Sequence, residues 1–241
     1  MLGDLTEYAL SGEEGMPYTA EEDGVETYRL FRIPILAVLA IIVVVYVIVV
    51  ESAEQIRARK NYSYNTQHET LPLGQYIEDQ WDNSVAGYKF GFTTFGGVGC
   101  EVAAVYNLMI SLGRPERLSE TIYKFEKWAI EFSVAWGNFG SNPRDIYRYL
   151  RKEKISYKRY TTSRYSKFCS TADGMSDGNF IFSRWNTPIT EGLHTFYVEK
   201  DGDYLSYNNK EVSNTTEMDA YLGGRSKAAF ICGYIIKTVR T

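Results

Sequence analysis

Cys100 is the residue around which the sequence suggests chemistry. It follows the glycine-rich run 96–99 and opens 100–112, a segment of helix-forming residues that Gly113 brings to a stop. A helix N-terminus presents unpaired N–H groups and the positive end of the helix dipole, and both favour thiolate over thiol. Cys100 is therefore a candidate nucleophile, although cysteine is also among the residues most often buried as a small hydrophobe.

A candidate base lies about ninety residues downstream, in a segment predicted to form a β-hairpin. His194 lies on the first strand of this hairpin, and Asn208 and Asn209 end the second strand. A nucleophilic cysteine needs a general base within hydrogen-bond reach and a third group that orients the base. The order Cys, His, Asn along the chain supplies all three.

The turn of the hairpin decides which asparagine faces His194. With Asp201-Gly202 as a two-residue loop, His194 lies opposite Asn209. With Lys200-Asp201-Gly202 as a bulged type I turn, His194 lies opposite Asn208. We favour the second register, and with it Asn208, because only glycine then needs a positive φ.

The Cys100 stretch, the His194 hairpin and the turn 139–143 between them resemble the papain-like cysteine peptidases, and among these the bacterial group that processes double-glycine leader peptides. The resemblance covers about residues 75–237. It implies hydrolysis of a peptide or protein substrate through the triad Cys100, His194 and Asn208. One position departs from the family pattern: Thr94 stands where these peptidases usually place a glutamine for the oxyanion hole.

The predicted elements after residue 100 belong to the α+β class. Helices are expected at 100–112 and 118–132, and a third is expected to begin after Asn142, which suits an N-cap. Strands are expected at 155–160, 179–185, 193–200, 203–208 and 228–237, with a polar segment at 161–178 and a short helix at 216–222. Helices first and hairpins afterwards suit a papain-like division into a helical half and an antiparallel sheet half.

The N-terminal part has a different composition. Residues 1–32 are acidic and lack an amphipathic repeat, so we expect a disordered tail. Residues 33–50 carry no charge and would span about 27 Å as a helix, close to the hydrocarbon thickness of a bilayer. We predict a transmembrane helix at 33–50, a polar stalk at 51–70 and the peptidase-like domain at 71–241.

The charges that flank the apolar segment indicate its orientation. Arg29 and Arg32 lie immediately before it, whereas the basic residues after it begin only at Arg57. Because positive flanks favour the cytoplasmic side, we expect a single-pass protein, held in the lipid bilayer by residues 33–50, whose catalytic domain lies outside the cytoplasm.

Other classes of function find little support in the sequence. The basic residues after position 50 are balanced by acidic ones, which argues against nucleic-acid binding. His68 is the only other histidine, and Cys169 and Cys232 form no Cys-x-x-Cys pair, so no metal or other cofactor is expected. We interpret Cys232 as a buried thiol, and a disulfide with Cys169 stays open.

Two further hypotheses use the same residues. A membrane-tethered, non-catalytic module could hold peptides in a papain-like groove, and Thr94 in place of the family's glutamine favours it. An amidase or acyltransferase would use the same triad on a different acyl group.

Overall fold

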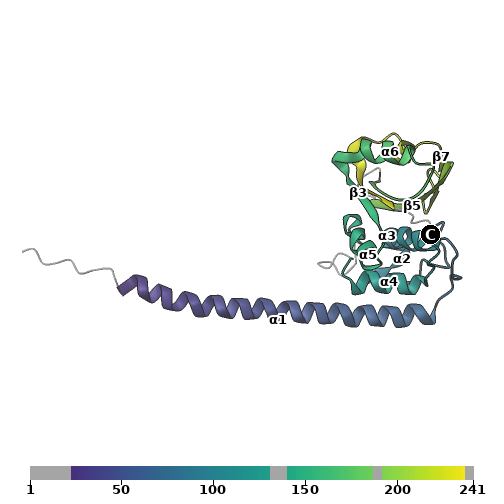
Figure 1. Cartoon of the computed structure of the whole chain (residues 1–241). Coiled ribbons are helices and arrows are strands. Elements are labelled where there is room, and N and C mark those ends of the chain that lie inside the picture. Colours follow the sequence, from purple (N-terminus) through teal and green to yellow (C-terminus); the bar gives the residue numbers. More distant parts are fainter. Residues whose placement is uncertain (1–22, 131–139, 187–191, 237–241) are drawn as a thin grey trace, which may run out of the picture. The chain divides into compact units, whose positions relative to one another are not determined.

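The computed structural model describes residues 23–130, 140–186 and 192–236, and side chains from Ile35 onward (Figure 1). The chain divides into two compact units, Met1–Val50 and Glu51–Thr241. The expected disorder of residues 1–22 lies outside the described residues, as does Phe139 of the turn that contributed to the family resemblance.

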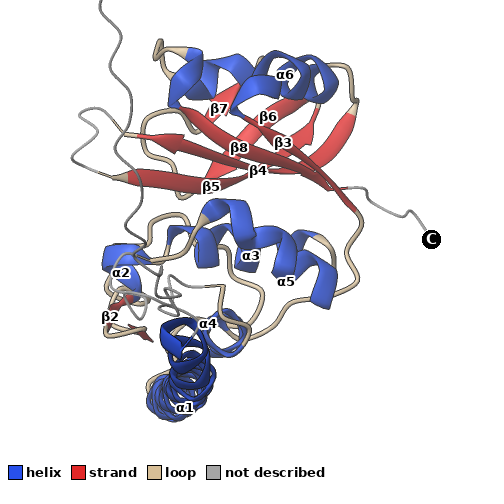
Figure 2. Ribbon diagram, turned by 90° about the vertical axis from the view of Figure 1, so that its left-hand side faces the viewer, coloured by secondary structure: helices blue, strands red, loops and turns tan. Residues whose placement is uncertain are grey.

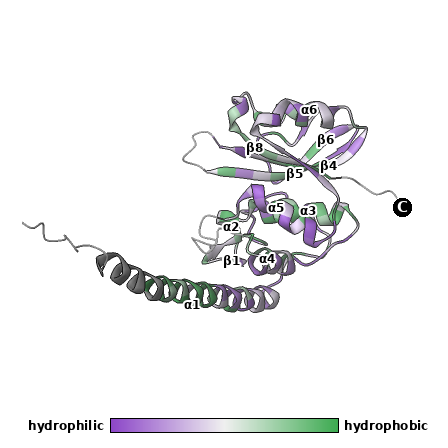
Figure 3. Cartoon of the chain, turned by 60° about the vertical axis from the view of Figure 1, so that its left-hand side comes forward, coloured by the Kyte–Doolittle hydropathy of each residue, from purple (hydrophilic) through white to green (hydrophobic). Residues whose placement is uncertain are grey.

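The first unit ends in the long helix α1 (Asp23–Gln67), which continues into the second unit. Side chains from Ile35 to Val49 are all exposed, and Figure 3 shows this stretch of α1 as continuously hydrophobic. Among the described residues, α1 alone is long and apolar enough to cross a membrane, and its position near the N-terminus also fits a signal sequence. Residues 23–32, expected to be disordered, are helical.

The segment expected to be a stalk, residues 51–70, is instead packed within the second unit. It forms the last turns of α1, where Ala58 and Asn65 are fully buried. Asn65 donates to the main-chain oxygen of Lys89 (2.9 Å) and accepts from its N–H (2.7 Å). This pairing satisfies the outer edge of a short strand, which explains why a polar segment is held on the domain.

We expect the fragment 51–241 to fold as a soluble protein, and further deletion to residue 67 to destabilise it. The longer deletion exposes apolar surface around Ala58 and removes the buried hydrogen bonds of Asn65, which are together worth about 3 kcal/mol. Urea unfolding of the two fragments measures the difference. Equal stability would mean that the last turns of α1 are a free stalk after all.

The second unit contains helices and strands in the following order along the chain. After α1 come β1 (Lys89–Phe90), β2 (Thr93–Thr94), α2 (Phe95–Val98), α3 (Cys100–Ser111), α4 (Leu118–Lys127), α5 (Ile146–Lys152), β3 (Tyr157–Thr161), α6 (Tyr165–Asp173), β4 (Asp177–Trp185), β5 (Leu193–Asp201), β6 (Asp203–Tyr207), β7 (Asn214–Thr215) and β8 (Phe230–Ile236), with short 3₁₀ turns that include Met218–Leu222.

Strands β3 to β8 form one antiparallel sheet with the order β3-β8-β4-β5-β6-β7. Figure 2 shows α3 and α5 below this sheet and α6 above it. Alternate residues of each strand therefore enter two different cores. Tyr197 of β5 packs in the core that contains α3, whereas its neighbours Phe196 and Val198 pack in the core that contains α6. The predicted α+β class, with a helical half and an antiparallel sheet, is confirmed.

Helix α6 lies inside 161–178, the segment for which the sequence analysis predicted polar character and no helix or strand. Its buried residues are Tyr165, Phe168, Cys169 and Ala172, which recur at helical spacing. The predicted N-cap at Asn142 is confirmed, because its side chain accepts a hydrogen bond from the Arg144 N–H at 3.0 Å. The helix expected to reach residue 132 ends at Lys127.

Candidate functional site

Cys100 begins α3, as the sequence predicts, and a tight junction with α2 fixes its position. The Gly99 N–H donates to the main-chain oxygen of Phe95 at 2.7 Å. A Cβ atom at Gly99 would lie 2.4 Å from the Phe95 ring, so the two helices can meet this closely only with glycine between them. Cys100 is 6% exposed at this junction.

The thiol of Cys100 makes its side-chain hydrogen bond to the next residue. Its Sγ donates to Glu101 Oε2 at 3.2 Å. Burial, and then the negative charge of Glu101, raise the pKa of Cys100 well above its ordinary value, although the Thr195 main-chain N–H opposes the shift. The expectation that the helix N-terminus would favour the thiolate is therefore wrong for this arrangement, because desolvation and a like charge outweigh the dipole.

Glu101 is buried without a cationic partner. It forms no ion pair with any described residue, and it is 1% exposed. Its Oε1 lies 3.4 Å from the Thr195 hydroxyl, which in turn lies 2.9 Å from the Ser183 hydroxyl. Burial raises the pKa of Glu101 to about 7.

His194 lies on β5, where the sequence places it, but its ring shares a face with Phe196. The two rings stack with centroids 5.7 Å apart, and Phe196 belongs to the core on the α6 side of the sheet. Nε2 of His194 donates to the main-chain oxygen of Asn208 at 2.5 Å. Cys100 and His194, both described in full, are not joined by a hydrogen bond. It is Thr195, the next residue, that faces Cys100 and Glu101.

The charges near His194 come from β4 and from the loop after β6. Burial lowers the pKa of His194, and the Arg184 guanidinium lowers it further, while the bond to Asn208 and the Glu211 carboxylate raise it. His194 is therefore a neutral imidazole at physiological pH.

The hairpin register differs from both alternatives that the sequence left open. Lys200 pairs with Tyr204 and Asp201 pairs with Asp203, with Gly202 alone at the tip at a φ of 79°. On the α6 side of the sheet, Lys200 Nζ donates to the carbonyl of Asp173 at the end of α6 at 3.0 Å. The positive φ expected of Gly202 is confirmed, whereas the bulged turn that we favoured is wrong.

Asn208 still meets His194, but through its main chain. It directly follows β6 at a φ of 58°, a left-handed conformation that asparagine tolerates better than most residues. Its side chain pairs with Gln80: Oδ1 accepts from the Gln80 N–H and Nδ2 donates to Gln80 Oε1, both at 2.9 Å. Asn209 is also buried, and its Nδ2 donates to the Val212 carbonyl at 2.9 Å.

Gln80 is the site residue that sequence reasoning missed. Its Nε2 donates to the Gly96 carbonyl at 2.9 Å, so this one side chain links the end of β6 to α2, directly before Cys100. Thr94, the position of the family's glutamine, is instead part of β2. Gln80 lies in a loop with acidic neighbours, and its partner Asn208 is 128 residues away, so no local pattern marks it.

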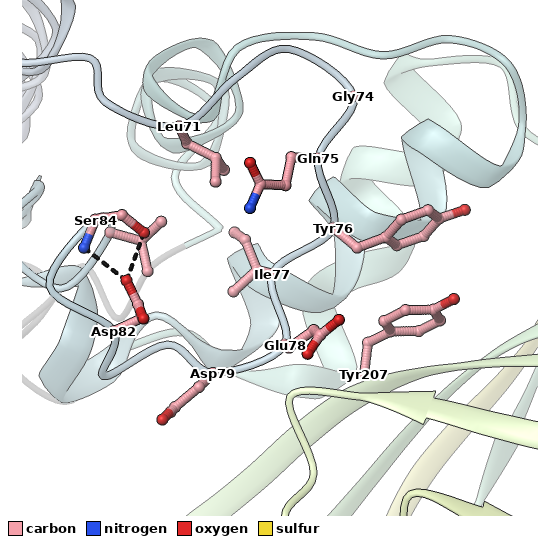
Figure 4. Close-up of a pocket in the computed structure, with 11 residues that line it drawn as sticks. Leu71, Gly74, Gln75, Tyr76, Ile77, Glu78, Asp79, Asp82, Ser84 and Tyr207 are labelled. Atoms are coloured by element: carbon pink, nitrogen blue, oxygen red, sulfur yellow. Dashed lines mark hydrogen bonds between the residues drawn. The ribbon is translucent and has the colours of Figure 1, made fainter.

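A cavity of about 650 Å³ lies beside this link. Asp79 and Tyr207, the chain neighbours of Gln80 and Asn208, both line it. Figure 4 shows the rings of Tyr76 and Tyr207 side by side on one wall, stacked with centroids 4.4 Å apart. The lining also includes three carboxylates, Glu78 beside Tyr207 and Asp79 and Asp82 farther along the loop, of which Asp79 is paired with Lys210 at 2.6 Å.

Cys169 and Cys232 are free, buried thiols, so they form no disulfide with each other. The described residues contain no group of three histidine, cysteine or acidic side chains that could hold a metal ion.

Comparison with family models, with curated proteins and with solved structures finds no match for this chain.

Proposed function

We propose that the protein is a membrane-anchored hydrolase that cleaves peptide bonds through Cys100, on a papain-like fold. The observation that carries this proposal is the contact between helix α3 and strand β5. The start of α3 lies against the start of β5, where the hydroxyl of Thr195, the neighbour of His194, lies 3.4 Å from Oε1 of Glu101, the neighbour of Cys100. A cysteine at a helix N-terminus and a histidine on the adjoining strand are two of the groups that acyl transfer by a thiol needs.

The triad roles in this proposal are those expected from the sequence. Cys100 attacks the acyl carbon, His194 exchanges protons with the leaving group, and Asn208 holds the imidazole, here by its main-chain carbonyl. In the structure the His194 ring lies with Phe196 on the α6 side of the sheet, so these roles need a different placement of the ring from the one described.

A peptide substrate has a place to bind in the cavity lined by Asp79 and Tyr207, the chain neighbours of Gln80 and Asn208. The cavity next to Gln80 offers a stacked tyrosine pair and peptide-sized volume. In this proposal residues 33–50 anchor the protein in the bilayer, and the domain acts outside the cytoplasm on peptides that reach the membrane surface.

A second candidate function is a tethered module that binds peptides without cutting them. Two observations favour it: the Cys100 thiol is buried with a raised pKa, and His194 is engaged with Asn208. Such a module would keep the cavity and have no use for a nucleophile.

Cys100→Ser separates the two functions. We incubate the detergent-solubilised protein with a tryptic digest of casein and identify products by mass spectrometry. A hydrolase should cleave a subset of peptides, and Cys100→Ser should reduce cleavage by at least about a hundredfold, since the nucleophile is lost. Cys169→Ser, at another buried thiol, is the matched control.

Peptides retained equally by the wild type and by Cys100→Ser, with no new termini, would establish the binding module. Cleavage that survives in Cys100→Ser would end the assignment of Cys100.

A further inference from the structure

The thiol of Cys100 and the carboxylate of Glu101 form an isolated acid–base pair. Sγ and Oε2 are 3.2 Å apart, and the two residues are 6% and 1% exposed. Because an ionised carboxylate can only accept, the thiol is the donor in this hydrogen bond. The proton of the candidate nucleophile is therefore already directed at Glu101.

Among the described residues, none forms an ion pair with Glu101 that would hold the carboxylate for a structural reason. From β4 and β5 come the hydroxyls of Ser183 and Thr195. From β8 comes the Cys232 thiol, whose pKa is raised by burial and by Glu101 and lowered by the nearby Arg159 and Arg144. On α3 itself the titratable neighbour is Cys100. A buried carboxylate without an ion pair is costly, so its presence beside a thiol calls for an explanation.

The charge balance decides how this thiol can ionise. If Cys100 lost its proton to solvent while Glu101 was ionised, two negative charges would be buried in contact. If the proton moves from Sγ to Oε2, the pair keeps a single negative charge throughout. Transfer within the pair is therefore the less costly route to a thiolate.

We propose that Glu101 is a catalytic residue: it takes the Cys100 proton when the thiolate forms and returns it to the leaving group. This inference rests on the proposed hydrolase function. In the first step the S–H bond breaks, Oε2 gains the proton and the thiolate forms a C–S bond with the acyl carbon. The C–N bond then breaks, and the amine takes the proton from Oε2. In the second step Glu101 accepts a proton from the attacking water, and the released thiolate takes it back.

Under this assignment Glu101, and not His194, exchanges protons with Cys100 and with the leaving group, so Glu101 replaces the histidine in the triad roles proposed above. The His194 imidazole is bonded to the Asn208 carbonyl on the other face of the sheet, whereas Glu101 touches the sulfur directly. Thiolate formation then depends on the ionisation of Glu101 and not on that of His194, and this difference can be measured without any substrate.

The test is the rate of Cys100 alkylation by iodoacetamide as a function of pH, followed by mass spectrometry on the full-length protein in detergent. In the wild type the rate should rise about tenfold between about pH 6 and about pH 8 and then level off, as one controlling group of pKa near 7 requires. Glu101→Gln, which keeps the size of the side chain, should lose this step and react several-fold more slowly at about pH 8. Glu101→Asp should restore the step in part, and His194→Ala should keep it.

Several results would overturn the proposal. Glu101→Gln could react as fast as the wild type or faster at about pH 8, which would make Glu101 a restraint on the thiol and not its base. His194→Ala could abolish the step, or the wild type could react only at alkaline pH, like a free thiol. Each of these leaves the hydrolase itself intact if Cys100→Ser still stops casein cleavage, so the two proposals fail separately.

Discussion

Glu101→Gln is expected to stabilise the protein by about 3 kcal/mol at about pH 8 and by less than about 1 kcal/mol at about pH 5. Burial raises the pKa of Glu101 from 4.5 to about 7. A carboxyl whose pKa is higher in the folded state contributes its full stability below pH 4.5 and loses that contribution as the pH rises through about 7. Glutamine has nearly the same shape, fills the same space and never ionises, so the variant does not lose this stability as the pH rises.

Urea unfolding of the 51–241 fragment at the two pH values measures this effect. The matched control is Glu217→Gln at an exposed position, which should change the free energy of unfolding by less than about 0.5 kcal/mol at either pH. A gain for Glu101→Gln that is equal at both pH values would show that the carboxyl does not ionise in the folded protein. A loss at about pH 8 would show that its charge is favourably held.

Local periodicity predicted the elements but not which face each strand presents. The apolar run from Cys100 and the alternation along β5 are local signals, and both elements form where expected. The sheet is covered by helices on both sides, so Phe196 and Tyr197 are equally buried and the sequence does not distinguish the two faces. Its pattern therefore could not place His194 on the α6 side.

The remaining differences depend on contacts between distant residues. Lys200 bonds to the end of α6, an element absent from the sequence prediction. The link from Gln80 to Asn208 joins loops 128 residues apart. The high pKa of Cys100 depends on how deeply the start of α3 is buried, whereas the sequence shows only that it begins a helix. Local sequence therefore predicted the elements that contain Cys100 and His194, but not how these two residues are oriented or what they bond to.

Arg184 and Glu211 form a partly buried ion pair near His194. The Arg184 side chain is 2% exposed, and its Nη2 lies 2.8 Å from Glu211 Oε2. Its Nε and Nη1 have no hydrogen-bond partner in the part of the chain that the structure describes. Burial lowers the pKa of Arg184, because removing the charged guanidinium from water is unfavourable. Glu211 therefore offsets a charge that the protein cannot release to solvent.

Glu211→Ala should destabilise the 51–241 fragment by about 2 kcal/mol, since it leaves the buried Arg184 guanidinium without its carboxylate. Because Glu211 is about half exposed, the loss of stability should be smaller than for a fully buried ion pair. It should also lower the pKa of His194, because Glu211 raises that pKa and Arg184 lowers it. Urea unfolding and an NMR titration of the His194 ring measure the two effects.

Lys210→Ala is the matched control. It breaks an exposed ion pair with Asp79 and should cost less than about 1 kcal/mol without moving His194. If Glu211→Ala costs no more than this control and leaves the histidine titration unchanged, Arg184 is compensated by other groups and its ion pair with Glu211 does not tune the candidate base.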